Sequence, residues 1–359
     1  MVSGELDRVE EISGQGIPAW GYALGGPKVG SGPGAVTRGA MWLNLPRAGT
    51  RVERLLLSIG IFTDREIRTP ISWKLVVDGV SISREFRPHF VVETDDGYYM
   101  KAIYDVKPVL AGRVLRQESH KILVYRDAVH PIRVADALLY ARFENEKARY
   151  AVSYYTGAVA LEPGEYYKVD ADIGRGFGGK RTAGVILHSP YHDAAFELIA
   201  GGSRPERAVG HGVHYIEVTV PYKGSPVPVS LRYVDPGFKF YPRIAVLTEV
   251  IATELLAPAP EPRLVIESVE ASDTRVRVKG IVENVGDDVL DSTMLVVLAL
   301  GARLARKTMP PVDPGKSINF SLEFDISRLP IRPSRASIRL IWRRLGETRL
   351  VSEEIQIPS

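Results

Sequence analysis

Residues 73–79 read WKLVVDG, and residues 196–202 read FELIAGG. Each stretch starts with an aromatic side chain, continues with mostly aliphatic residues and ends in a glycine turn, as the arm of a β-hairpin does. Three further pairs of similar stretches keep the same order in the chain: 55–59 with 184–188, 104–106 with 215–218, and 122–125 with 229–232. The preserved order predicts an internal duplication, with Trp73 and Phe196 at equivalent core positions.

Short apolar runs bounded by turn residues dominate the chain, and no stretch keeps the apolar spacing of a helix over three turns. The best helix candidate, residues 134–149, also fits a strand, which we favour. We predict an all-β chain of two tandem jelly-roll-like β-sandwiches followed by an immunoglobulin-like β-sandwich. The predicted domains are 1–145, which begins with an irregular arm over residues 1–20, then 146–256, a Pro-rich linker at 257–262, and 263–359.

Composition narrows the classes of function. The net charge is only +3 at pH 7, too small to indicate binding of nucleic acid or of an anionic membrane surface. The chain has no cysteine, which excludes disulfides, thiolate metal sites and a cysteine nucleophile. It has no stretch of about 18 apolar residues, so we predict no membrane-spanning segment.

Scarce asparagine and glutamine, an excess of arginine over lysine and Pro-rich loops indicate a protein from a hot environment. No basic and apolar leader is visible among the first residues. The sequence therefore leaves the localisation open between the cell surface and the cytoplasm.

Residues 263–359 carry a signature of their own. A strand at 264–269, an Asn-Val-Gly turn within 281–286 and a Pro-Gly turn at 314–317 follow one another, and an alternating strand comes next. In this order they resemble the domain family called CARDB, for cell-adhesion-related, of archaea and bacteria. The resemblance implies an immunoglobulin-like sandwich of about seven strands and assigns no catalytic residue.

The chain as a whole also resembles archaeal surface proteins of unknown function, in which tandem jelly-roll modules precede a CARDB domain. This resemblance is carried by residues 34–39, 73–79, 104–106 and 137–140. It implies an archaeal source, a place at the cell surface or outside the cell, and a role in adhesion or assembly.

Histidines gather in the second predicted module. Imidazole and carboxylate ligands for a metal could come there from His188, His192, His211, His214, Asp193 and Glu217. However, Pro190 interrupts the first pair, and the odd spacing of His211 and His214 puts them on opposite faces of a straight strand. We expect loop and turn histidines and no cofactor, with a transition metal as the alternative.

Three other features are candidate ligand sites. The acidic loop at 93–97 offers oxygen ligands for calcium but lacks the spacing of a calcium loop, so we expect a solvated turn. Residues 174–180 match the phosphate-loop pattern GxxxxGK, yet Arg181 follows where Ser or Thr is needed, so we expect an ordinary loop between strands. Alternation should expose one ring of each tyrosine pair, and these pairs are Tyr98 and Tyr99, Tyr154 and Tyr155, and Tyr166 and Tyr167.

No catalytic set of residues can be assembled from the sequence, and the nucleophile elbow GxSxG is absent. We predict a non-catalytic structural, adhesion or assembly protein that binds a protein or glycan partner, or a second copy of itself, through sandwich surfaces. One alternative is a carbohydrate-binding or carbohydrate-processing protein that uses the paired jelly rolls, which needs an aromatic platform and carboxylates on one concave face. The other is a metal-dependent enzyme centred on the second jelly roll.

Overall fold

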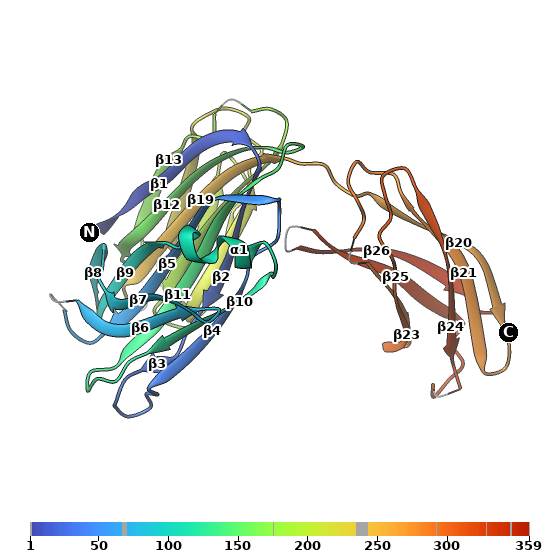
Figure 1. Cartoon of the computed structure of the whole chain (residues 1–359), viewed down its shortest axis with the longest axis horizontal. Coiled ribbons are helices and arrows are strands. Elements are labelled where there is room, and N and C mark those ends of the chain that lie inside the picture. The colour runs from blue at the N-terminus through green and yellow to red at the C-terminus, as the bar shows by residue number, and fades with distance from the viewer. Residues whose placement is uncertain are drawn as a thin grey trace. The chain divides into compact units, whose positions relative to one another are not determined.

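A computed structural model describes residues 2–66, 70–174, 176–234, 243–291, 293–327, 329–344 and 347–358. Nearly all regular structure in these ranges is β-strand, arranged in packed sheets, so the predicted all-β sandwich fold is confirmed (Figure 1). The chain divides into two compact units, Met1–Ala257 and Pro258–Ser359. Within the described ranges, no helix is long and apolar enough to cross a membrane.

The first sandwich pairs a sheet of order β4-β10-β6-β7 with a sheet of order β2-β11-β5-β9-β8, in which the short β3 also pairs with β11. Its strands are β2 (Ile17–Leu24), β3 (Lys28–Val29), β4 (Arg38–Asn44), β5 (Arg51–Thr63), β6 (Ile71–Val77), β7 (Val80–Phe86), β8 (Phe90–Thr94), β9 (Gly97–Asp105), β10 (Ser119–Tyr125) and β11 (Ile132–Glu144).

The second sandwich pairs a sheet of order β13-β18-β15-β16 with a sheet of order β1-β12-β19-β14-β17. Its strands are β1 (Ser3–Gln15), β12 (Arg149–Leu161), β13 (Tyr166–Ala171), β14 (Lys180–Ser189), β15 (Ala195–Ala200), β16 (Glu206–Val209), β17 (Gly212–Thr219), β18 (Val227–Val234) and β19 (Ala245–Leu256).

The two sandwiches repeat one strand order. When the strands of the two copies are matched by their succession along the chain, the sheet order β4-β10-β6-β7 corresponds to β13-β18-β15-β16. The sheet order β2-β11-β5-β9 corresponds in the same way to β12-β19-β14-β17. The registers also agree, because Leu75 of β6 and Leu198 of β15 take the same place opposite β10 and β18. Trp73 and Phe196 lie two residues before these leucines, and both are buried. The predicted duplication and the equivalence of these two aromatic residues are confirmed.

The sheets that contain β11 and β19 pack face to face, which joins the two sandwiches into one unit. Tyrosine and aliphatic side chains from both sheets form a shared core, in which the rings of Tyr140 and Tyr154 stack with their centroids 5.0 Å apart. Strands β5, β12, β14 and β19 are therefore buried on both faces over most of their length. Such strands read as continuous apolar runs, without alternation.

Two local expectations differ from the structure. Residues 3–15, expected within an irregular arm, form β1 at the edge of the second sandwich, where they pair with β12. Most side chains of β1 are exposed, so no apolar pattern marked it as a strand. The short helix α1 (Lys107–Val114) was not predicted either, because it buries only Leu110 and Val114. The preferred strand over the helix candidate at 134–149 is confirmed in its first part by β11.

The C-terminal unit is a sandwich of a sheet of order β20-β21-β24 on a sheet of order β23-β22-β25-β26. Asn284, in the predicted Asn-Val-Gly turn, is buried and donates hydrogen bonds to the backbone oxygens of Asp288 and Val312. The immunoglobulin-like character of this unit stays a prediction. Its strands are β20 (Pro262–Ala271), β21 (Arg275–Asn284), β22 (Met294–Ala299), β23 (Ala302–Thr308), β24 (Ser317–Asp325), β25 (Arg335–Arg344) and β26 (Glu347–Gln356).

Candidate ligand-binding cleft

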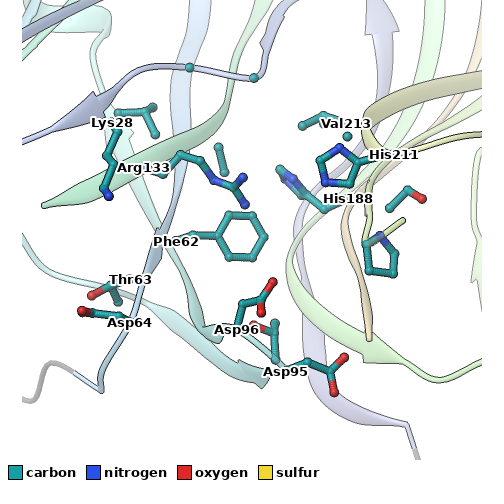
Figure 2. A pocket seen from close by; sticks show the side chains of 18 of the residues that line it. Lys28, Phe62, Thr63, Asp64, Asp95, Asp96, Arg133, His188, His211 and Val213 are labelled. Carbon is teal, nitrogen blue, oxygen red and sulfur yellow. The ribbon is translucent and has the colours of Figure 1, made fainter. Parts of the chain in front are cut away.

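A cleft of about 610 Å³ opens between the two sandwiches, at one end of their facing sheets (Figure 2). The ends of β5, β8 and β11 border it on the side of the first sandwich. On the side of the second sandwich it is bordered by the ends of β14 and β17 and by Ile244, which directly precedes β19. Its charged and aromatic lining includes Lys28, Phe62, Asp96, Arg133, His188 and His211.

Equivalent positions of the two copies meet in this cleft. Each copy has a β-bulge, in which Ala135 of β11 and Thr248 of β19 are the extra residues. Alignment on these bulges makes Phe62 of the first copy equivalent to His188 of the second, and both line the cleft. The sequence match of 55–59 with 184–188 had paired Ile59 with His188, which is a shift of three residues from the structural alignment. The match of 104–106 with 215–218 is shifted by three residues in the same way.

Directly behind the cleft, each bulge is followed by a buried carboxylate, and both carboxylates meet one lysine. Lys101 of β9 lies 3.4 Å from Asp136 and 2.5 Å from Glu249, and all three side chains are fully buried. The Ser58 hydroxyl donates to Glu249 over 2.6 Å, and Lys101 also donates to the backbone oxygen of Thr248 over 3.4 Å. These residues form a buried ionic cluster that ties the two copies together.

The buried environment shifts the pKa values of the two carboxylates of the cluster in opposite directions. One lysine and two carboxylates would leave a net negative charge in a dry interface, which costs several kcal/mol. Burial raises the pKa of Glu249. Burial would also raise the pKa of Asp136, but Lys101 and the hydrogen bond with His188 outweigh it and hold that pKa well below its usual range. Asp136 is therefore the stronger acid of the pair and is ionised, whereas Glu249 holds a proton more readily than an exposed glutamate does.

His188 connects this cluster to the cleft. Its Nε2 lies 2.6 Å from Asp136 Oδ2, an oxygen that also accepts from the Tyr99 hydroxyl over 2.8 Å. Burial lowers the pKa of His188 against the opposing effect of Asp136. A neutral imidazole that donates from Nε2 to a carboxylate has an unprotonated Nδ1. His188 can therefore accept a hydrogen bond, or a proton, from a group bound in the cleft.

Groups of both charge signs surround Phe62. The Arg133 guanidinium lies 4.7 Å from the centre of the Phe62 ring, and the His188 ring packs edge-on against it with centroids 5.2 Å apart. Figure 2 shows Lys28 and Arg133 above Phe62, and Asp95 and Asp96 below it. Asp95 accepts the backbone amides of Arg243 and Ile244, which fixes the acidic loop against the start of β19.

The predicted metal ligands do not converge. His188 and His211 line the cleft, whereas the other four lie outside its lining. The His192 and His211 rings have centroids 5.7 Å apart, His214 bonds to the backbone oxygen of Gly210, and Glu217 accepts the Tyr215 hydroxyl. Asp193 is exposed. In the ranges that the structure describes, no three side chains of these types come together as metal ligands do.

The other candidate sites are placed as follows. Thr94, Asp95 and Asp96 of the acidic loop line the cleft. In the loop at 174–180, of which Arg175 lies outside the described residues, the Phe177 and Gly179 amides donate to Glu254 over 2.8 and 3.0 Å. That loop joins strands β13 and β14, as predicted.

The tyrosine pairs differ from one another. Tyr154 packs into the core between the sandwiches and Tyr155 into the core of the second one, so the expected exposed ring of this pair is absent. Tyr99 is fully buried beside Asp136, while Tyr98 and Tyr167 are half-buried. Tyr166 is exposed. The expectation was wrong for the second pair because both faces of β12 are covered.

Five residues that build this site were not predicted from the sequence: Phe62, Lys101, Arg133, Asp136 and Glu249. A signal for three of them was present. Lys101, Asp136 and Glu249 are isolated ionisable residues inside apolar strands. A charge within a continuous apolar run indicates a buried group that must have a partner.

No family model matches the chain, and no curated protein matches it. Among solved structures, it is similar to a β-glucuronidase of Parabacteroides merdae with glycerol in the active site, at 12% identity and a TM-score of 0.24, over 56% of this chain and 28% of that chain. A β-glucuronidase of Ruminococcus gnavus is 14% identical, with a TM-score of 0.22, over 56% and 36%. A GH2 β-galacturonidase of Eisenbergiella tayi bound to galacturonate is 12% identical, with a TM-score of 0.21, over 55% and 35%. This chain thus spans about a third of the length of those chains. The resemblance to the CARDB family and to archaeal surface proteins stays a prediction.

Proposed function

We propose that the unit Met1–Ala257 recognises a glycan in the cleft between its two jelly rolls. The observation that carries the proposal is that cations, carboxylates, a neutral histidine and an aromatic ring converge on one concave site. Sugars present many hydroxyl groups that both donate and accept hydrogen bonds, together with apolar C–H faces. A volume of about 610 Å³ lies within the range of small-ligand pockets.

Each group has a distinct task in this proposal. The Nδ1 atom of His188 accepts a hydrogen bond from a sugar hydroxyl, and Asp136 fixes the orientation of the imidazole ring. Arg133 can donate several hydrogen bonds, and the cation–π contact with Phe62 keeps the guanidinium at the wall of the cleft. Asp96 accepts hydroxyls from the opposite side. Adhesion through a bound glycan agrees with the non-catalytic role that the sequence predicts.

Isothermal titration of the full chain with soluble neutral, amino and uronic oligosaccharides tests the proposal. We expect at least one of these classes to bind, and Arg133→Gln to weaken that binding at least about tenfold, because a hydrogen bond to a charged group is lost. Arg207→Gln is the matched control, because Arg207 is exposed on β16 and does not line the cleft. Absence of binding to every class, or equal losses in both variants, would overturn the proposal.

Carbohydrate processing is the second candidate function, and the pair of His188 and Asp136 favours it. An imidazole held by a carboxylate and open to a cleft can act as a general base. Incubation of the full chain with the bound oligosaccharide, followed by mass spectrometry of the products, tests this candidate. Turnover that disappears in His188→Gln would support it, and an unchanged oligosaccharide would exclude it for that ligand.

A further inference from the structure

A second hollow lies beside the cleft, at the open edge of the first sandwich. Its volume is about 470 Å³, and its walls come from β2 and β4, the edge strands of the two sheets. The side chains that give it an apolar and aromatic character are Tyr22, Leu24, Met41 and Trp42. Gly25 lines both this hollow and the cleft.

Building on the proposed glycan recognition, we infer that the ligand is an oligosaccharide chain that leaves the cleft over Gly25 and stacks on Trp42 in this aromatic hollow. The cleft then fixes one sugar residue by hydrogen bonds, and the hollow binds a later residue of the same chain by its apolar face. The protein is thereby selective for chains over single sugars.

Gly25 lies where the two hollows meet, because it lines both of them. No atom lies within 4 Å of the position that a Cβ would take there, and the residue has φ +72°. The neighbouring Gly26, in contrast, would place a Cβ 2.7 Å from Met41 Sδ. The amides of Gly25 and Gly26 bond to the backbone oxygens of Ala135 and Val134 at the bulge of β11, both over 2.9 Å. Open space therefore lies at Gly25, over backbone that these hydrogen bonds hold in place.

Trp42 is exposed for a structural reason. Residues of β4 alternate strictly, so that Met41 and Leu43 point into the sandwich while Trp42, 59% exposed, points outward. Lys121 of the neighbouring strand β10 lies over its ring at 5.1 Å. Tyr22 is 37% exposed and rests on the Tyr215 ring, with centroids 4.7 Å apart. Two partly exposed aromatic rings thus border the hollow, and each contacts a neighbouring side chain.

The chemistry of both ends favours a glycan as the occupant. The C–H faces of a sugar ring pack on an aromatic side chain, and its hydroxyls remain free for water or for Lys121. A lipid chain fits the hollow but not the charged cleft into which it would continue. A peptide is the competing occupant, because β2 and β4 are sheet edges that can pair with an added strand.

The test measures affinity against chain length, from one to six residues, for the glycan class that the full chain binds. We expect longer chains to bind about tenfold more tightly than the single sugar, and Trp42→Ala to remove this gain while single-sugar binding stays the same. Gly25→Asn should also reduce the gain with chain length, because asparagine tolerates positive φ and its side chain would enter the open space where the two hollows meet. Tyr222→Ala is the control, since Tyr222 is 45% exposed and lines neither hollow.

The outcomes separate the inference from the proposed function. If single sugars bind through Arg133 but length has no effect, or if Trp42→Ala keeps the gain with length, the inference is overturned and the proposed function stands. If no sugar of any length binds, both fall. If strand-forming peptides displace the long oligosaccharide in wild type and not in Trp42→Ala, the hollow is a peptide site and the inference is overturned.

Discussion

The two jelly rolls share one strand order but carry different residues where they face each other. Phe62 in the first copy corresponds to His188 in the second, and Lys101 corresponds to Tyr215. At the internal core of each sandwich, by contrast, an aromatic residue is kept, as Trp73 and Phe196 show. The core of each copy thus retains the features that its fold requires, whereas the candidate site depends on residues that differ between the copies at their shared interface.

The bulges explain how a symmetric frame produced an asymmetric site. Each bulge interrupts the pairing of its strand just before a carboxylate, Asp136 in one copy and Glu249 in the other. Both carboxylates then point into the interface, but only the first copy supplies the lysine between them and only the second supplies the histidine. The cleft therefore needs both copies.

The largest effect should come from breaking the buried ionic cluster. Lys101→Met leaves two buried carboxylates without their cation, and we expect a loss of about 3–5 kcal/mol in the free energy of unfolding. Chemical denaturation of the full chain measures it. Adding Asp136→Asn and Glu249→Gln to the same variant should restore part of the loss, since the charges are then removed. If Lys101→Met alone were as stable as wild type, the association of the two copies would not depend on this lysine.

The equivalence of the two cores can be tested by truncating both aromatic residues. Trp73→Ala and Phe196→Ala should each cost about 3–5 kcal/mol, because each leaves a cavity in a closed core. Thermal and chemical unfolding of the two variants should give similar losses. A large loss in one variant and less than about 1 kcal/mol in the other would contradict an equal role of the two positions.

The smallest effect concerns pH and sharpens the contrast between Phe62 and His188. Burial lowers the pKa of His188 below its ordinary value of 6.5, while Asp136 opposes and Lys101 and Arg133 add to the lowering. The unfolded chain therefore binds more protons at this residue than the folded chain does just below pH 6.5. The contribution of His188 to stability should be full above pH 6.5 and should fall as the pH drops below it.

The difference in unfolding free energy between wild type and His188→Gln isolates this contribution, because the remaining titrating groups are common to both proteins. Wild type should lose stability relative to the variant as the pH falls through this window. A difference that stays constant with pH would show that His188 titrates alike in the folded and unfolded chain. Glycan binding should weaken at lower pH than this onset, as the pH falls through the lowered pKa of His188 in the folded chain, since protonation of Nδ1 removes its acceptor.

Much of the fold was predictable from local patterns. Alternation and glycine turns identified strands such as β6 and β24, and the order of similar stretches revealed the duplication. The Pro-rich stretch at 257–262 lies where the chain divides into its two units. These features depend on residues that are neighbours in the chain, so they can be predicted without knowledge of the tertiary structure. The alignment of β5 with β14 was predicted three residues out of register, because strands that are buried on both faces lack the alternation of apolar and polar residues that would fix the alignment.

The site was decided by the tertiary structure alone. Lys101, Asp136 and Glu249 are far apart in the chain and belong to strands of two different sandwiches, so no local pattern indicates that they meet. The sequence showed isolated charges in apolar strands, but only the face-to-face packing of the two sheets shows which charge balances which. The physical reason is that burial and electrostatic pairing depend on which surfaces come into contact, whereas strand formation depends on the residues beside one another.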